Sequence, residues 1–154
     1  MSEVERIAEQ LRKTFEGAAW HGPSVRELLA STTRGQAAKR PIPGAHTIWE
    51  IVLHIGVWES VVRRRLSGEL VTNLAPNQDW PPVHDVSETA WTRTREELDQ
   101  GHLQLQQSII QLSDERLGEI VAGKDYTVYV MVHGVIQHDL YHAGQIALLK
   151  RAFA

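Results

Sequence analysis

Two histidines lie four residues apart in the segment QHDLYHAGQI, residues 137–146, near the end of the chain. Residues i and i+4 of an α-helix share one face, with Cβ atoms about 5–6 Å apart. Both imidazoles can therefore reach one ion at the usual metal–nitrogen distance of roughly 2.0–2.1 Å. The spacing of His138 and His142 fits metal chelation. The alternative is a buried pair that only hydrogen-bonds to carbonyl or carboxylate oxygens.

The residues around this pair argue against two known kinds of metal site. The segment H-D-x-x-H is one methylene short of the H-E-x-x-H of zinc proteases, in which the acid is the general base. Those proteases take a third ligand from downstream, but AGQIALLKRAFA contains no histidine, aspartate or glutamate. Di-iron bundles need a Glu-x-x-His pair on each of two helices, and the chain has no such pair. A mononuclear site with a ligand from upstream remains.

His54 is the best candidate for that upstream ligand. In HTIWEIVLHIGVWE it lies three residues after Ile51 and four before Trp58, so it faces the interior from a different helix. His102 also falls near an apolar stripe, where we expect a hydrogen bond rather than ligation. The other four histidines lie at turns, in a proline-rich loop or off the shared face: His21, His46, His84 and His133.

Ligation by His54, His138 and His142 would leave one coordination position open, as in catalytic rather than structural zinc sites. We expect a divalent transition metal there, zinc or nickel first, while iron, cobalt and manganese also suit these ligands. Asp139 could act as a base, orient a ligand or face solvent. Three further residues could line a pocket beside the metal or simply pack in the core: Trp58, Tyr141 and Gln145.

Helical periodicity marks the segments that must position these residues. It predicts long helices over residues 2–19, 46–67, 87–112 and 127–151, and a short extra helix over residues 24–31. Residues 32–46 and 69–86 are rich in proline and read as loops, the second being either a pocket wall or a plain connector. One or two further turns can follow Ser113. The fold class is therefore an all-α four-helix bundle, with connections too long for simple up-down-up-down order.

Composition limits the classes of function. The chain has 154 residues, 42% of them hydrophobic, which favours one domain over residues 1–154. Its formal charge of −3 gives no broad positive field, so we expect neither nucleic acid nor a membrane as partner. The absence of cysteine excludes disulfides and cysteine nucleophiles, so sulfur chemistry would need an external thiol. Because no signal-like or membrane-spanning apolar run occurs, we expect a soluble cytoplasmic protein.

The pattern HTIWEIVLHIGVWE, followed far downstream by HGVIQHDLYHAGQIALLKR, resembles the DinB-like, or YfiT-like, family of metal-dependent enzymes. The likeness covers nearly the whole chain, including the segment GPSVRELL and the Gly-Gln-Ile after His142. It implies a four-helix bundle of unusual helix order and a divalent metal held by one histidine of the second long helix and two of the last. Carried onto this sequence, the implied ligands are His54, His138 and His142, the same three that inward direction selects.

The resemblance implies less about the reaction. Some members work as transferases or isomerases with low-molecular-weight thiols such as bacillithiol or mycothiol, and others are described as hydrolases. We expect a mononuclear metalloenzyme acting on a small molecule, by thiol-dependent S-transfer or metal-assisted hydrolysis. The competing hypothesis is a non-catalytic metal-binding bundle that serves as a scaffold, sensor or dimerisation module. A symmetric homodimer is compatible with both.

Overall fold

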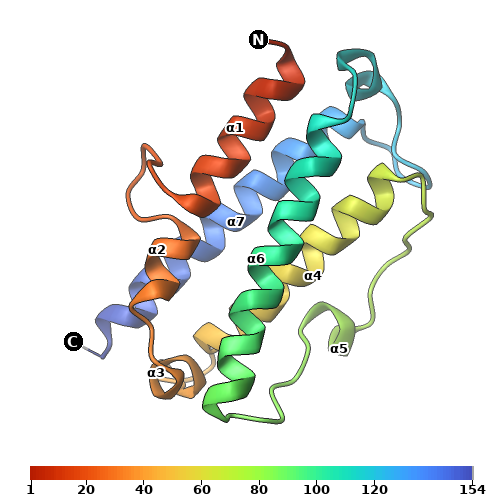
Figure 1. The fold of residues 1–154 in the computed structure, drawn as a ribbon. Helices are drawn as coiled ribbons and strands as arrows, with labels where there is room; N and C mark the ends of the chain where they lie inside the picture. Colours follow the sequence, from red (N-terminus) through yellow and green to blue (C-terminus); the bar gives the residue numbers. More distant parts are fainter. Residues whose placement is uncertain (154) are drawn as a thin grey trace.

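The computed structural model describes residues 1–153, and over that range every regular element is helical (Figure 1). Four long helices form the body: α1 (Glu3–Glu16), α4 (Ile48–Leu66), α6 (Glu88–Ile110) and α7 (Val128–Arg151). Four short ones lie in the connections: α2 (Val25–Ala30), α3 (Arg34–Ala38), α5 (Pro76–Asp79) and the 3₁₀ helix η1 (Asp114–Gly118). The predicted all-α four-helix bundle, with a short extra helix after the first long one, is confirmed.

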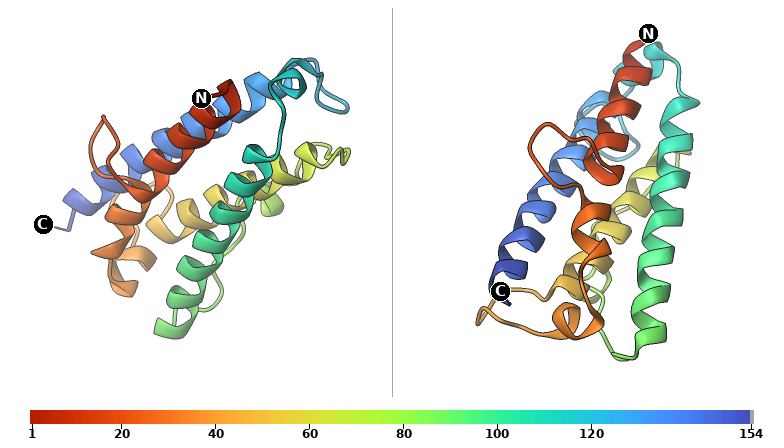
Figure 2. Two further views of the ribbon diagram at one scale, coloured as in Figure 1. Left: turned by 45° about the horizontal axis from the view of Figure 1, so that its top comes forward. Right: turned by 60° about the vertical axis from the view of Figure 1, so that its left-hand side comes forward.

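The order of the long helices around the bundle differs from their order in the chain. α4 packs against α6 and α7, and α1 packs against the same two helices. α4 and α6 run in one direction, whereas α1 and α7 run in the other (Figures 1 and 2). Residues 67–87 connect the two parallel helices α4 and α6, so they must return along the bundle. The bundle is thus not up-down-up-down, as the long connections predicted.

Each long helix begins at a hydroxyl side chain. Ser2, Thr47, Ser87 and Thr127 have extended backbones, and their side-chain oxygens accept a hydrogen bond from the backbone N–H three residues later. Such caps satisfy a donor that the first helical turn leaves free. They fix where α4 and α7 start, and hence the heights at which their histidines lie.

Three details differ from the sequence-based expectation. α1 ends at Glu16 rather than near residue 19, because Gly17 and Ala18 take positive φ values of 143° and 58°. Residues 32–46 are not all loop: Thr33 and Gln36 form a capping box that starts α3, and the prolines follow only after this helix. Residues 69–86 contain one helical turn, α5, which tolerates Pro76 because a first helical residue needs no N–H partner.

A layer of buried polar side chains divides the core into two apolar clusters. One cluster includes Ile55, Leu98 and Ala143, and the other includes Val62, Leu105 and Ile136. On every long helix, at least one buried polar residue lies between the stretches that enter the two clusters: Thr14 on α1, Glu59 on α4, His102 on α6, and Asp139 and His142 on α7. Glu59, His102 and Asp139 come from three different helices and lie close enough together to offer atoms within 4.8 Å of one another. We call Glu59, His102 and Asp139 the polar layer.

No helix within residues 1–153 has both the length and the apolar character needed to cross a membrane.

We predict that Thr47→Ala lowers the free energy of unfolding by about 1 kcal/mol, because Thr47 Oγ1 accepts the N–H of Glu50 at 3.1 Å at the buried start of α4. Urea unfolding followed by circular dichroism measures the change. Thr72→Ala, at an exposed loop threonine, is the control and should leave stability unchanged. Equal midpoints for the two variants would contradict this account of the cap.

Candidate metal centre

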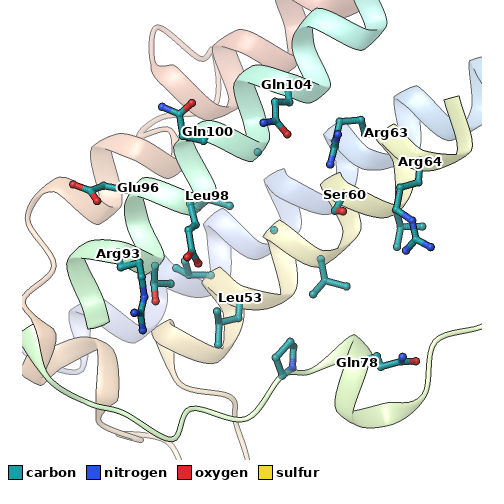
Figure 3. A pocket seen from close by; sticks show the side chains of 18 of the residues that line it. Leu53, Ser60, Arg63, Arg64, Gln78, Arg93, Glu96, Leu98, Gln100 and Gln104 are labelled. Carbon is teal, nitrogen blue, oxygen red and sulfur yellow. The ribbon is translucent and has the colours of Figure 1, made fainter. Parts of the chain in front are cut away.

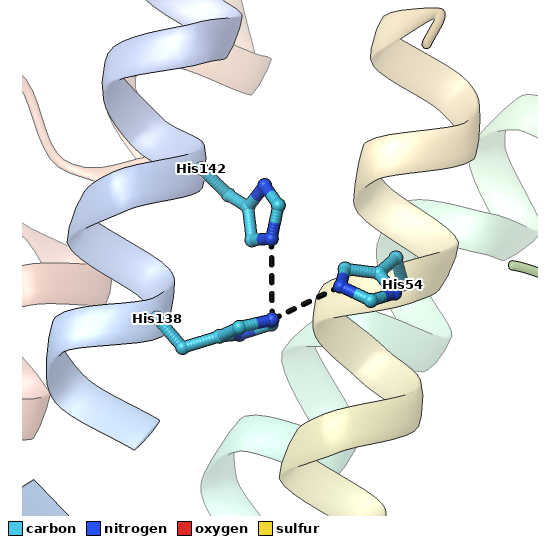
Figure 4. A group of neighbouring side chains, drawn as sticks. All are labelled: His54, His138 and His142. Carbon is cyan, nitrogen blue, oxygen red and sulfur yellow. Dashed lines mark hydrogen bonds between the residues drawn. The ribbon is translucent and has the colours of Figure 1, made fainter. Parts of the chain in front are cut away.

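Three histidine rings from two helices meet at one point (Figure 4). Nε2 of His138 lies 3.0 Å from Nε2 of His54 and 3.1 Å from Nε2 of His142. His138 and His142 stand one turn apart on α7, and His54 approaches them from α4. His54 and His142 are buried, whereas the side chain of His138 is 24% exposed. The structure therefore brings together the three histidines selected from the sequence, with one of them open to solvent.

Hydrogen bonds on the far side of two rings determine their tautomers. Nδ1 of His54 lies 2.7 Å from the carbonyl oxygen of Asp79, which can only accept, so this nitrogen donates its proton. Nδ1 of His142 donates in the same way to Oε1 of Gln145 at 2.7 Å. In the neutral rings, Nε2 then carries no proton and presents a lone pair to His138. The centre is built from nitrogen acceptors that face one another.

A cation satisfies this arrangement better than a proton does. One proton on Nε2 of His138 can bridge to His54 or to His142, but the second close contact then joins an acceptor to a nitrogen without a shared proton. A tetrahedral ion with metal–nitrogen bonds of roughly 2.0–2.1 Å has ligand nitrogens about 3.3 Å apart, close to the separations found here. These three rings thus fit a divalent metal with small adjustments of the side chains.

Burial favours the neutral form of two of the rings. Desolvation lowers the pKa of both His54 and His142, although the hydrogen bonds to Asp79 and Gln145 act in the opposite direction. A lowered pKa keeps the rings neutral and their Nε2 lone pairs available near pH 7.

The long connection between α4 and α6 forms one wall of the centre. Besides the carbonyl oxygen of Asp79, its carboxylate lies 3.2 Å from Nδ1 of His54 and accepts the indole N–H of Trp58 at 2.8 Å. Trp80 stacks on His54 with ring centroids 3.7 Å apart, and its other face carries His46 at 3.5 Å. Residues 69–86 are therefore a wall of the site as well as a connector.

Asp79, Trp80 and His46 escaped the sequence analysis. His46 was set aside because it precedes a helix, and Asp79 and Trp80 lie in a segment without periodicity. The one local sequence signal for the position of Asp79 is Pro76, because proline favours the first position of a helix.

The structure places the four residues for which the sequence allows more than one role. Gln145 orients His142, and Trp58 bonds to Asp79 while its ring centroid lies 6.0 Å from that of His138. Tyr141 is mostly exposed, although its ring lies beside His142. Asp139 does not face solvent: it is fully buried, with one carboxylate oxygen 3.6 Å from Nδ1 of His138. It therefore adjoins the three-histidine cluster from inside the bundle.

The polar layer continues from Asp139 into the core. Nδ1 of His102 bonds to Oε1 of Glu59 at 2.7 Å, and its ring stacks on Phe15. His102 is thus hydrogen-bonded within the layer and lies outside the three-histidine cluster, as expected. Four atoms of the layer are buried without a hydrogen-bond partner: Oε2 of Glu59, Nε2 of His102 and both carboxylate oxygens of Asp139.

Burial dominates the protonation of this layer. It raises the pKa of Glu59 to about 8, and together with the nearby charge of Glu59 it raises the pKa of Asp139 to about 7. It also lowers the pKa of His102 to about 4. At neutral pH the layer therefore holds a neutral imidazole and at least one protonated carboxyl group.

A groove of about 670 Å³ lies between α4 and α6, on the side of α4 away from the three-histidine cluster (Figure 3). Its walls mix cationic and acidic side chains, such as Arg93 and Glu96, and include none of the three clustered histidines. The three-histidine cluster therefore lies outside this groove.

We predict that Glu59→Gln flattens the dependence of stability on pH. The folded protein retains a proton on Glu59 up to about pH 8, while the unfolded chain loses it near the ordinary value of 4.5, so the free energy of unfolding falls as pH rises between these limits. Glutamine keeps the hydrogen bond to His102 but cannot ionise. The free energy of unfolding, measured with urea, should fall between pH 5 and pH 8.5 in both proteins, and the fall should be smaller in the variant by at least about 1 kcal/mol.

Glu97→Gln, at an exposed site on α6, should keep the wild-type pH dependence. Parallel curves for wild type and Glu59→Gln would show that Glu59 ionises at its ordinary pKa.

Comparisons with known proteins agree with this fold. A crystal structure of a conserved protein from Enterococcus faecalis superposes with a TM-score of 0.73, covering 99% of this chain and 97% of that one at 16% identity, which shows a shared fold. No curated protein matches the sequence. The sequence profile of the DinB superfamily matches residues 19–146, which include all three clustered histidines. The chain therefore belongs to the DinB superfamily, and the resemblance inferred from the sequence is confirmed.

Proposed function

We propose that the protein binds one divalent transition metal through Nε2 of His54, His138 and His142, and that it is a mononuclear metalloenzyme acting on a small molecule. The observation that carries the proposal is the approach of three Nε2 atoms to 3.0 and 3.1 Å, with the far nitrogens of two rings already used as donors. Neutral imidazoles favour zinc or nickel, and also accept iron, cobalt or manganese.

The metal would polarise a ligand in its open position, either a water for hydrolysis or a small thiol for S-transfer. The side chains of the protein do the remaining work. Asp79 and Gln145 hold His54 and His142 in the ligating tautomer, and Trp80 covers one face of His54. Because the chain has no cysteine, a thiol would have to be supplied from outside. We place S-transfer ahead of hydrolysis on the family resemblance.

Access to the centre favours an enzyme over a closed structural site. Two rings are buried, but His138 is partly exposed and lines a groove of about 330 Å³ between α4 and α7. A structural metal site has no need for such an opening, whereas a catalytic site needs one to admit its substrate.

We predict that His138→Ala abolishes metal binding. Wild-type protein without an affinity tag should carry near one equivalent of transition metal by elemental analysis, and the variant should carry almost none, because two nitrogens remain. His133→Ala is the matched control, since this histidine also lies on α7 but outside the cluster. Circular dichroism checks that both variants fold. Unchanged metal content in His138→Ala would reject the site.

We predict that an external thiol enters the coordination sphere. Titration of the cobalt-substituted protein with 2-mercaptoethanol should produce the near-ultraviolet charge-transfer absorption of a cobalt–thiolate bond. Ethylene glycol, which offers oxygen instead of sulfur, should produce none. An absorption spectrum that does not change on addition of thiol would identify a closed site and favour the non-catalytic bundle.

A further inference from the structure

The groove beside His138 has apolar walls and one buried cation. Its walls include Trp58 and Val62 of α4 and Met131 and Val135 of α7. His138 and Arg65 also line it. The ring centroid of Trp58 lies 5.9 Å from Cζ of Arg65 and 6.0 Å from the ring centroid of His138, so both polar residues adjoin the same indole. A small molecule in the groove can therefore reach a cation and the metal centre at the same time.

Arg65 lacks a countercharge. It is only 8% exposed, and its guanidinium donates to two neutral acceptors, the hydroxyl of Tyr126 at 3.0 Å and the carbonyl oxygen of Val71 at 3.2 Å. Its Nε is buried without a hydrogen-bond partner. Within residues 1–153 no aspartate or glutamate forms an ion pair with it, whereas Arg64, the preceding residue, pairs with Glu69 on the surface.

A buried guanidinium without an anion is unfavourable, because arginine stays charged and loses hydration. Tyr126 and Val71 accept hydrogen bonds from Arg65 but supply no negative charge. An anion that enters the groove would supply the missing charge and would be held more strongly than at the surface, since the surroundings are apolar.

We propose that this groove selects a small organic carboxylate with an apolar body, whose carboxylate pairs with Arg65 and whose other end lies beside His138. The position of that other end rests on the proposed metal centre, whereas the contact with Arg65 does not. The groove thus defines a substrate class for the site, acids with a short hydrocarbon chain.

The first experiment uses metal-free protein, so that no metal can bind the carboxylate. Binding of hexanoate and of neutral hexanamide is measured at pH 7.5 from amide and indole shifts in ¹H–¹⁵N spectra. We expect hexanoate to bind about tenfold more tightly, with the largest shifts at Trp58 and Gly134, because a charged partner strengthens the hydrogen bonds that Arg65 makes. Equal affinities of the wild type for the two probes would overturn the proposal, whatever the behaviour of any variant.

Arg65→Met should remove the preference for hexanoate while leaving hexanamide binding within about twofold. Arg64→Met, which removes the neighbouring surface cation, should keep the wild-type preference. A preference that persists in Arg65→Met would place the carboxylate elsewhere, for instance on the histidine cluster, and would also overturn the proposal.

The second experiment separates this inference from the metal proposal. In the cobalt-loaded protein, paramagnetic relaxation should broaden the methyl end of hexanoate more than the protons next to its carboxylate. The opposite gradient would place the carboxylate on the metal and overturn the orientation. If the protein binds no cobalt while metal-free protein still prefers hexanoate, the proposed metal function fails and the carboxylate contact stands.

Discussion

The site depends on three imidazole nitrogens that lie close together. Nε2 of His138 makes two short contacts, to Nε2 of His54 and of His142, but has at most one proton to share between them. Two of the rings are committed by their outer hydrogen bonds to the carbonyl oxygen of Asp79 and the amide oxygen of Gln145. Their inner nitrogens are acceptors that lie 3.0 and 3.1 Å from Nε2 of His138, and one proton on His138 can satisfy only one of the two contacts, so the other is repulsive unless a cation lies there. The bundle holds this unfavourable pattern because α4 and α7 are neighbours that run antiparallel, although residues 67–127 separate them in sequence.

The centre is supported from both sides. On the outside, α5 and Trp80 close over His54, so a segment without periodicity completes the wall. On the inside, Asp139 lies behind His138, and Glu59 and His102 lie next to Asp139. Apolar side chains in place of these three would make the core more stable. Buried carboxyl groups with unmet hydrogen-bonding capacity reduce stability, and such local departures from a well-packed core are typical of functional sites. The polar layer thus adjoins the three-histidine cluster through Asp139.

Helical periodicity made most of this fold predictable. The inward stripes of α4 and α7 place His54, His138 and His142 together because side-chain direction on a helix follows directly from spacing. Asp139 was harder: it follows His138 by one residue, and periodicity on one helix cannot show that neighbouring helices cover that side too. Glu59 lies one residue after Trp58, outside the predicted apolar stripe, so the same limit applies to it. Asp79 and Trp80 depend on how a proline-rich connection folds back, which no periodic pattern encodes.

The central claim is that His54 and His142 present unprotonated Nε2 atoms to His138 and that a metal takes them. Long-range ¹H–¹⁵N spectra of the histidine side chains, recorded for metal-free protein before and after one equivalent of Zn²⁺, test this directly. The account predicts the Nδ1–H tautomer for both rings in the metal-free protein at neutral pH, and a large shift of their Nε2 signals, together with that of His138, when zinc is added. A proton on Nε2 of either ring that zinc does not displace would contradict it.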